Sequence, residues 1–265
     1  MSFLQNKMAL GAILVGIIGV ASFGVILALN VTPEDNSIDV TLLYNAGVMI
    51  EANDMRIYID PYTLPDNYTE LPADVIMVTH PHGDHYHYRS IEKIATEDTV
   101  FIFPENMSTE LNRHGGHAVN PGDVVDLGSG ISVTAFWMYT YLPPELMEDY
   151  EPSHPREANW TSYIIDIDGF TLFHAGDAKC LDEYEELTGT IDVAFLPLGP
   201  GCQTMCDSEV VDALEVIEPT YFIPIHYGDG TEETFETTYG TQITNLGVEM
   251  QVLAYWEATE FTNDT

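Results

Sequence analysis

Short apolar runs that end in glycine, proline or polar residues dominate the chain after its first 37 residues. Runs of this length, closed by turn-forming residues, are typical of β-strands. A helix is predicted over Ser90 to Thr96, where Ser90 can cap the first turn. In the first half the pattern predicts strands over Ile38 to Tyr44, Arg56 to Asp60, Asp74 to Thr79, Thr99 to Phe103, Asp123 to Leu127 and Ile131 to Met138.

The second half repeats the pattern after a proline-rich loop, Tyr139 to Arg156. Ser208 to Ile217 has an apolar stripe at helical spacing, and Phe235 to Leu246 has a weaker one. Because each half has strands followed by helices, we expect an α/β fold of two mixed sheets with helices outside, a four-layer αββα sandwich. The strands predicted in this half are Thr161 to Asp166, Phe170 to Phe173, Ile191 to Pro197, Tyr221 to Ile225 and, last, Glu249 to Leu253.

The pattern near the amino terminus is different. Met8 to Leu29 is an uncharged apolar run, as long as the roughly 20 residues that a helix needs to cross a bilayer. It is too long for a signal peptide and lacks a good cleavage site, so we predict an uncleaved, single-pass membrane anchor. Lys7 precedes the run and acidic residues follow it, which favours an external globular part. The predicted organisation is an anchor and linker over 1–37 and one domain over 38–265.

Charge narrows the range of partners. The chain has 7 Lys and Arg against 43 Asp and Glu, a net charge of −36. This charge repels phosphate backbones and anionic lipid surfaces, so nucleic acid is not expected as a partner. A small-molecule substrate is compatible with it. Such acidity with little lysine is typical of a halophilic protein, since high salt screens self-repulsion; an ordinary acidic exported domain is the alternative.

The strongest chemical signal follows the predicted strand that ends at Thr79. The sequence Thr79-His80-Pro81-His82-Gly83-Asp84-His85 places three imidazoles and a carboxylate at one strand end. These are ligands that zinc and similar divalent ions prefer. Four ligands within six residues cannot all bind one tetrahedral ion without strain, so the cluster suggests two adjacent ions with further ligands from elsewhere. A surface histidine cluster that includes His87 is the alternative.

Further candidate ligands lie near other predicted strands. His174-Ala175-Gly176-Asp177 follows the strand that ends at Phe173, and His226-Tyr227-Gly228 follows the strand that ends at Ile225. His154 lies in the proline-rich loop, and His114 and His117 compete with it from another polar loop. Asp60 is either an acceptor for a ligand imidazole or only the start of an Asp-Pro turn.

Taken in order, these segments resemble the metallo-β-lactamase superfamily, and within it the ascorbate-6-phosphate lactonase-like group of metal-dependent hydrolases. The resemblance implies a first ion held by His80, His82 and His154, and a second held by Asp84, His85 and His226. It implies that Asp177 bridges the two ions, and that His174 is a supporting or core residue. The landmarks are Ile59-Asp60-Pro61, Thr79 to His85, His154, His174 to Asp177, Phe195 to Gly199, Thr204-Met205 and Ile223 to Tyr227.

The chain departs from this family at Asn45, where Gly-His is often found; Asn45 can hydrogen bond but cannot titrate. Basic residues are also scarce near the predicted ligands. Only Arg156 and Lys179 are close in sequence, as contacts to an anionic substrate or as ordinary solvated charges.

The predicted function is therefore a membrane-anchored metal-dependent hydrolase with two divalent ions, zinc first and manganese or iron as alternatives. A metal-activated hydroxide would attack an ester, lactone or phosphodiester bond, with Asp177 and Asp84 as the catalytic carboxylates. Asp84 could also relay a proton. The alternatives are a phospholipase D-like phosphodiesterase acting near the membrane, and a non-catalytic metal-binding sensory module.

Overall fold

A computed structural model describes residues 37–143, 146, 150–199 and 203–263. The predicted anchor, Met8 to Leu29, lies outside these ranges, as does most of the predicted linker. Within the described ranges, no helix combines the length and the apolar character that a bilayer crossing requires.

Two mixed seven-stranded sheets form the body of the domain, as predicted. The first sheet has the order β14-β1-β2-β3-β4-β5-β6 and is antiparallel from β14 to β3 and parallel from β3 to β6. Its strands are β1 (Ser37–Leu42), β2 (Val48–Ala52), β3 (Met55–Ile59), β4 (Val75–Met77), β5 (Val100–Pro104), β6 (His117–Val119) and β14 (Ala258–Thr262).

The second sheet has the order β13-β12-β11-β10-β9-β8-β7, and it is parallel from β10 to β13 and antiparallel from β7 to β10. Its strands are β7 (Val124–Gly128), β8 (Ile131–Trp137), β9 (Thr161–Ile167), β10 (Phe170–His174), β11 (Val193–Pro197), β12 (Tyr221–Ile225) and β13 (Glu249–Met250).

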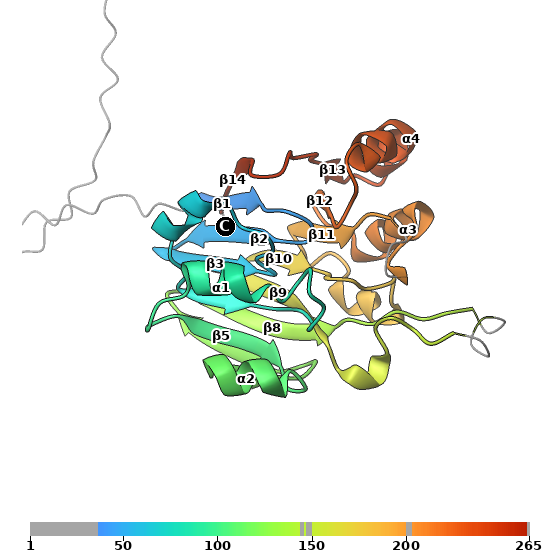
Figure 1. Cartoon of the computed structure of the whole chain (residues 1–265). Coiled ribbons are helices and arrows are strands. Elements are labelled where there is room, and N and C mark those ends of the chain that lie inside the picture. Colours follow the sequence, from blue (N-terminus) through green and yellow to red (C-terminus); the bar gives the residue numbers. More distant parts are fainter. Residues whose placement is uncertain (1–36, 144–145, 147–149, 200–202, 264–265) are drawn as a thin grey trace, which may run out of the picture. The chain divides into compact units, whose positions relative to one another are not determined.

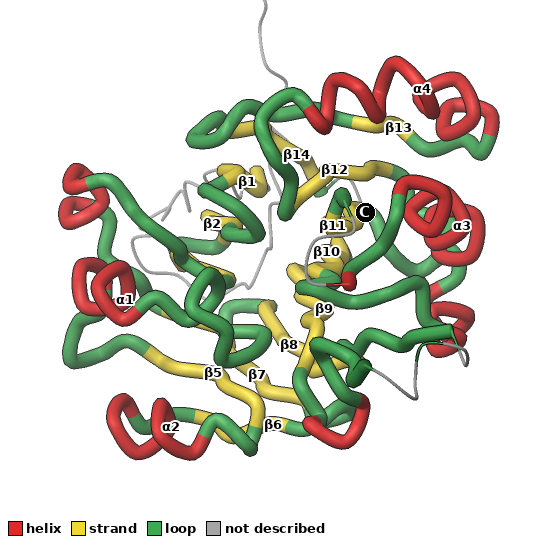
Figure 2. Tube along the Cα trace, turned by 45° about the vertical axis from the view of Figure 1, so that its right-hand side comes forward, coloured by secondary structure: helices red, strands yellow, loops and turns green. Residues whose placement is uncertain are grey.

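Helices cover the outer faces of the two sheets (Figures 1 and 2). On the side of the first sheet lie α1 and α2, and on the side of the second lie α3 and α4. The helices are α1 (Tyr88–Ile94), α2 (Ser108–His114), α3 (Asp207–Ile217) and α4 (Thr231–Asn245), with short 3-10 turns at Asp66–Glu70, Arg156–Ala158 and Asp182–Leu187.

Alternation along the strands explains this layering. In β3, Ile57 and Ile59 belong to the main core cluster, whereas Tyr58 belongs to a second cluster with Ile91 and Ile94 of α1. Successive strand residues point to opposite faces, so a strand that is apolar on both faces must be covered on both. The continuous apolar runs of the sequence therefore predict the helical outer layer correctly.

Several elements differ from the prediction. The hairpin strand β2, the helix α2 and the strand β6 were not predicted. The predicted last strand, Glu249 to Leu253, is wrong in extent, because β13 ends at Met250. The last strand is β14, which leaves the second half of the chain and pairs antiparallel with β1 in the first sheet. The two sheets are therefore not built from the two halves of the sequence separately.

The strand directions determine where the functional residues meet. Parallel strands β3, β4 and β5 have their carboxyl ends at one edge of the first sheet, and β10, β11 and β12 have theirs at one edge of the second. Loops after β4, β8, β10 and β12 hold every ligand that the family resemblance implies. Ligands commonly bind at the carboxyl ends of parallel strands, because the loops there converge.

Candidate metal centre

All the predicted metal ligands converge in the structure, although they come from four separate loops. Their ligand atoms fall into three overlapping groups, within each of which the atoms lie within 4.8 Å of one another. The groups are His80, His82 and His154; His80, His85 and Asp177; and Asp84, His85 and His226. The first and third groups coincide with the two ligand sets that the family resemblance implies.

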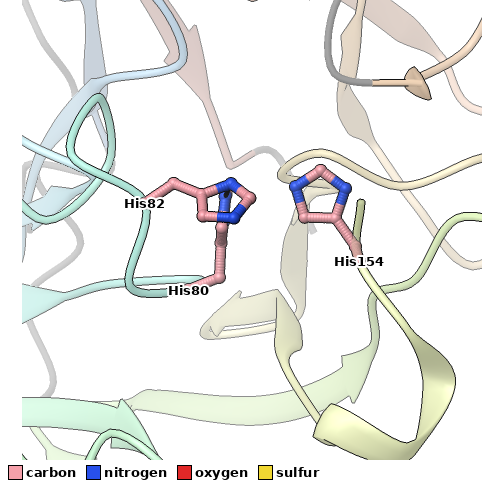
Figure 3. Close-up of side chains that lie close together, drawn as sticks. All are labelled: His80, His82 and His154. Atoms are coloured by element: carbon pink, nitrogen blue, oxygen red, sulfur yellow. Dashed lines mark hydrogen bonds between the residues drawn. The ribbon is translucent and has the colours of Figure 1, made fainter. Parts of the chain in front are cut away.

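The first group consists of imidazoles only. Figure 3 shows the rings of His80 and His82 turned toward the ring of His154, which comes from a different loop. His80 Nε2 and His82 Nδ1 are 3.0 Å apart. Two nitrogens bound tetrahedrally to one zinc at about 2.0 to 2.1 Å would be about 3.3 Å apart. The spacing of this group therefore suits one divalent ion.

The second group combines a carboxylate with two imidazoles. Asp84 Oδ2 lies 3.8 Å from His85 Nε2 and 3.6 Å from His226 Nε2. The Asp84 side chain is 35% exposed, whereas the His85 side chain is fully buried. Asn45 Nδ2 donates to Asp84 Oδ2 at 3.3 Å, so the residue that departs from the family pattern orients a candidate ligand.

Asp177 lies between the two groups. Its Oδ1 is 3.2 Å from His85 Nε2, and its Oδ2 is 3.5 Å from His154 Nε2 and 3.4 Å from His226 Nε2. The carboxylate is fully buried. A carboxylate that lies within 3.5 Å of imidazoles from both sets is placed to contact two cations at once.

The residues fit the divalent ions that the family implies. Ten buried side-chain atoms have no hydrogen-bond partner among the described residues, and six of them belong to candidate ligands: both Asp177 oxygens, both ring nitrogens of His154, and the Nε2 atoms of His85 and His226. Leaving so many buried polar atoms unpaired in one place is costly, and carboxylate oxygens and imidazole nitrogens are common metal ligands. Bound cations would satisfy most of these atoms together.

Electrostatics keeps His80 and His154 neutral and Asp177 ionised, as ligands of a cation must be, whereas His85 would have to release a proton to bind one. Burial lowers the pKa of His80 well below its usual value and lowers the pKa of His154 to about 4, so both imidazoles are neutral at pH 7. Burial opposes the charged form of His85 as well, but Asp177 and Asp60 raise its pKa well above normal. Burial would raise the pKa of Asp177, yet the neighbouring His85 lowers it to about 2.

Asp60 forms hydrogen bonds with the segment that carries the histidine motif. Its Oδ1 accepts from the Thr79 backbone N–H at 2.8 Å, and its Oδ2 accepts from Thr79 Oγ1 at 2.7 Å. His85 Nδ1 lies 2.8 Å from the same Oδ2. A proton on Nδ1 leaves the Nε2 lone pair of His85 free to face Asp84 and Asp177. Asp60 is therefore an acceptor for a candidate ligand imidazole, which decides between the two interpretations of the sequence.

Residues with positive φ angles at the strand ends orient the candidate ligands. Asp60 and His226 have φ angles of 48° and 53°, in the left-handed region that costs non-glycine residues about 1 to 3 kcal/mol each. Gly176, at φ 58°, precedes Asp177, and a Cβ at this glycine would lie 2.7 Å from Met138 Sδ. Asp177 can reach the site only because its predecessor has no side chain.

The other predicted candidates lie elsewhere. His174 Nε2 donates to the Ala46 carbonyl at 2.7 Å, and its Nδ1 accepts from Gly176 N, so it is a core residue. His114 is within 3.0 Å of the Tyr86 hydroxyl and stacks on Phe101, and it belongs to none of the three ligand groups. His117 is exposed on β6.

Arg156 and Lys179 are paired with carboxylates of the protein. Arg156 donates to Glu183 at 2.7 Å and lies 4.4 Å over the Trp137 ring. Lys179 donates to Glu209 at 2.6 Å. These pairs make either residue a poor contact for an anionic substrate.

Trp160 was missed by the sequence reasoning. Its ring centroid lies 5.3 Å from those of His80 and His82 and 5.6 Å from that of His154. The residue shields the first imidazole group with an apolar wall. A tryptophan just before the predicted strand at Thr161 is only a weak signal, since aromatic residues are common at strand starts.

Comparisons with known proteins agree with this geometry. The chain matches the model of the beta-lactamase superfamily domain over residues 39–226, which is more than half of its length. A UPF0173 metal-dependent hydrolase of Thermococcus kodakarensis is 29% identical over 199 residues, covering 72% of this chain and 84% of that protein. A UPF0173 metal-dependent hydrolase of Thermus thermophilus is 26% identical over 197 residues, with the same coverage of 72% and 84%.

Solved structures show the same fold. A protein of Parabacteroides distasonis described as a metal-dependent hydrolase superposes with a TM-score of 0.71 at 27% identity, covering 82% of this chain and 93% of that one. The metallo hydrolase Igni18 of Ignicoccus hospitalis gives a TM-score of 0.71 at 20% identity, covering 86% and 100%, which shows the fold alone.

The fold, the convergent histidines and aspartates and these relatives define a metal-dependent hydrolase. The chain belongs to the beta-lactamase superfamily, so the family prediction is confirmed. The lactonase-like subgroup stays a prediction.

Proposed function

We propose that the chain is a dinuclear hydrolase that cleaves an ester, lactone or phosphodiester bond of a small molecule. One observation supports two ions above all others: the buried Asp177 carboxylate, without hydrogen-bond partners among the described residues, lies between two sets of imidazoles. A purely structural zinc site needs four ligands and is closed. Here seven candidate ligands converge, and the side chain of Asp84 is 35% exposed.

Bound divalent ions would supply Lewis acidity, which lowers the pKa of a water and stabilises negative charge on the substrate. The chain supplies position and proton transfer. His80, His82 and His154 would hold one ion, and Asp84, His85 and His226 the other, with Asp177 shared. Zinc is the expected metal, with manganese or iron as alternatives, because the donors are imidazoles and carboxylates without thiolates.

Asp84 is the candidate for moving a proton. Hydrogen bonding and charge from His226 lower its pKa below the usual range, so it is ionised at neutral pH. Asn45 fixes one of its oxygens. Since solvent reaches Asp84 and not Asp177, it is the carboxylate that can exchange a proton with an incoming substrate or with water.

The choice of a lactone among the substrates rests on the sequence resemblance to the ascorbate-6-phosphate lactonase-like group. The membrane anchor, the external location and the halophilic origin rest on the sequence alone. Full-length protein that stays with membranes after high-salt and alkaline washes would support the anchor. Release of a shortened soluble form would contradict it.

Two other functions remain as alternatives from the sequence. The phospholipase D-like function depends on the anchor, and hydrolysis of phospholipid vesicles would support it. A non-catalytic module would bind metal without turnover.

Metal loading and hydrolysis test the proposal together. Metal-free protein is resupplied with zinc, manganese or iron, its metal content is measured, and it is assayed on aryl esters, lactones and bis-aryl phosphodiesters. We expect two ions per chain and hydrolysis that Asp177→Ala or His82→Ala abolishes while circular dichroism is unchanged. His117→Ala is the matched control, since His117 is exposed on β6. Unchanged rates in both site variants, or no bound metal, would contradict the proposal.

A further inference from the structure

Solvent reaches the candidate metal centre at three of its ligands. The side chains of His80, His85, His154 and Asp177 are fully buried, whereas Asp84 is 35% and His226 10% exposed and His82 is partly exposed. Asp84 and His226 belong to the same ligand group, so one open side of the centre lies beside this pair. The residues that border this side determine which substrates the centre accepts.

Aromatic rings lie on segments that are hydrogen bonded to the segments of Asp84 and His226, or pair with such segments. We call Tyr44, Tyr62 and Tyr255 the tyrosine surface. The Tyr44 ring stacks on that of Tyr62 with centroids 5.8 Å apart, and it meets the edge of Tyr255 at 5.0 Å. Tyr44 is 42% exposed, and Tyr62 and Tyr255 are partly exposed.

Hydrogen bonds connect the segments of the tyrosine surface with the segments of the candidate ligands. Tyr44 precedes Asn45, which donates from Nδ2 to Asp84 and accepts from the His226 N–H at 3.0 Å. The Tyr255 hydroxyl donates to the carbonyl of Tyr227, the residue after His226, at 2.9 Å. These bonds hold the segments that carry Tyr44 and Tyr255 next to the segments that carry Asp84 and His226.

The tyrosine surface is rigid. Tyr44 and Tyr62 form an isolated antiparallel backbone bridge. Tyr255 stacks on Tyr227 at 5.1 Å, and the Tyr227 hydroxyl donates to the Leu253 carbonyl at 2.9 Å. Rings that are already ordered lose little entropy when a ligand packs on them, so they favour binding of flat apolar groups.

Apart from any bound ions, the charges of the described residues around the same side disfavour anions. Burial raises the pKa of the Tyr227 and Tyr255 hydroxyls, and the nearby carboxylates of Asp229 and Glu232 add to this effect. Four of the described cationic side chains are paired with carboxylates: Arg56, Lys93, Arg156 and Lys179. A fifth, Arg113, lies over the Tyr88 ring. Arg89 is exposed on α1. Burial lowers the pKa of His87, and the charge of Arg89 lowers it further.

From this arrangement we infer that the substrate is an uncharged ester or lactone with an aromatic group that packs on the tyrosine surface. The inference rests on the proposed hydrolytic function and names its substrate class. In the reaction, the oxygen of water bonds to the carbonyl carbon, the acyl C–O bond breaks, the leaving oxygen takes a proton, and a carboxylic acid and an alcohol or phenol result.

Three probes test this substrate class on the metal-loaded protein. Dihydrocoumarin is an uncharged aromatic lactone, δ-valerolactone has the same ring size without the aromatic group, and bis(4-nitrophenyl) phosphate is an anionic aromatic phosphodiester. We expect Tyr44→Ala to raise KM for dihydrocoumarin about 3- to 10-fold, the value of one aromatic contact, with kcat little changed. KM for δ-valerolactone should be unchanged.

Two control variants make the test specific. Tyr44→Phe keeps the ring and should restore the KM for dihydrocoumarin, whereas Arg89→Ala should leave all three rates unchanged. The inference is overturned if Tyr44→Ala leaves the KM for dihydrocoumarin unchanged. It is equally overturned if the phosphodiester has the highest kcat/KM and loses it in Arg89→Ala.

A binding measurement separates this inference from the proposed function. Coumarin, which is uncharged and flat, is titrated into the metal-loaded protein while the tyrosine ring signals are followed by NMR. If none of the three probes is hydrolysed, the proposed function fails on these substrates, and the titration alone decides the inference. Binding that is lost in Tyr44→Ala and kept in Tyr44→Phe supports the tyrosine surface, and absence of binding overturns it.

Discussion

Replacing Asp60 by asparagine should weaken metal binding without unfolding the protein. An asparagine side chain has nearly the same size and tolerates the left-handed backbone at φ 48°. Its carbonyl oxygen can still accept from the Thr79 N–H, which is 2.8 Å from Oδ1. The amide NH₂ then replaces Oδ2, which lies 2.8 Å from His85 Nδ1.

The new N–H reverses the hydrogen bond to His85. Nδ1 must accept rather than donate, so the neutral ring carries its proton on Nε2. That nitrogen faces Asp84 and Asp177, and a protonated Nε2 cannot bind a cation. Loss of such an orienting carboxylate typically costs 10- to 100-fold in metal affinity, or about 1.4 to 2.8 kcal/mol.

Competition with a chromophoric chelator would measure this loss of affinity. The matched control is Asp192→Asn, because Asp192 Oδ2 accepts from the Thr171 N–H at 2.8 Å and from Thr171 Oγ1 at 3.1 Å. Asp192 precedes β11 and lies at the amino end of that strand, away from the candidate ligands. Equal metal affinity in the Asp60→Asn variant and the unmodified protein would refute the role assigned to Asp60.

Three further predictions concern the same domain. His154→Ala and His226→Ala remove ligands from different groups, so elemental analysis should find one ion per chain in each, and two in either would contradict the assignment. Gly176→Ala strains the backbone at φ 58° and clashes with Met138, so thermal unfolding should show a loss of about 1 to 3 kcal/mol together with lower activity. Burial opposes the charged form of Glu209, but the hydrogen bond from Lys179 lowers the pKa of Glu209 below normal. This pair therefore stabilises the fold above the unfolded pKa of 4.5, and the stabilisation is lost as the pH falls through the pKa of the folded state. Urea unfolding of Lys179→Met should therefore show a loss of about 1 to 2 kcal/mol at pH 7 that shrinks as the pH falls below 4.5, with unchanged KM.

The sequence predicted candidate ligands that converge in the structure, because most of them are local. Four lie within six residues after a continuous apolar run, and the others follow apolar runs of the same kind or lie in the loop before one. Strand direction then brings the loops together, so that the order of the motifs was enough to find the site. The role of Asp60 could not be decided from the sequence, because its partner His85 is 25 residues away and Asp-Pro is also a common turn.

The missed elements share a different cause. The helix α2 has no buried residues, so it shows no apolar stripe. Strand β2 joins β3 through Asn53 and Asp54, both with positive φ, as a two-residue hairpin requires. Asn53 and Asp54 are turn-forming residues, but the apolar run before them was not recognised as a strand. The tyrosine surface combines rings from three distant segments, which no local pattern connects.

The pairing of Ser37 with Thr262 has a consequence for biosynthesis. During synthesis from the amino terminus, β1 emerges early and its outer edge has no partner until β14 leaves the ribosome. Exposed strand edges recruit other chains, so nascent molecules are vulnerable to aggregation throughout this interval. A translational arrest before Ala258 should therefore yield insoluble product, even though every candidate ligand has already been made.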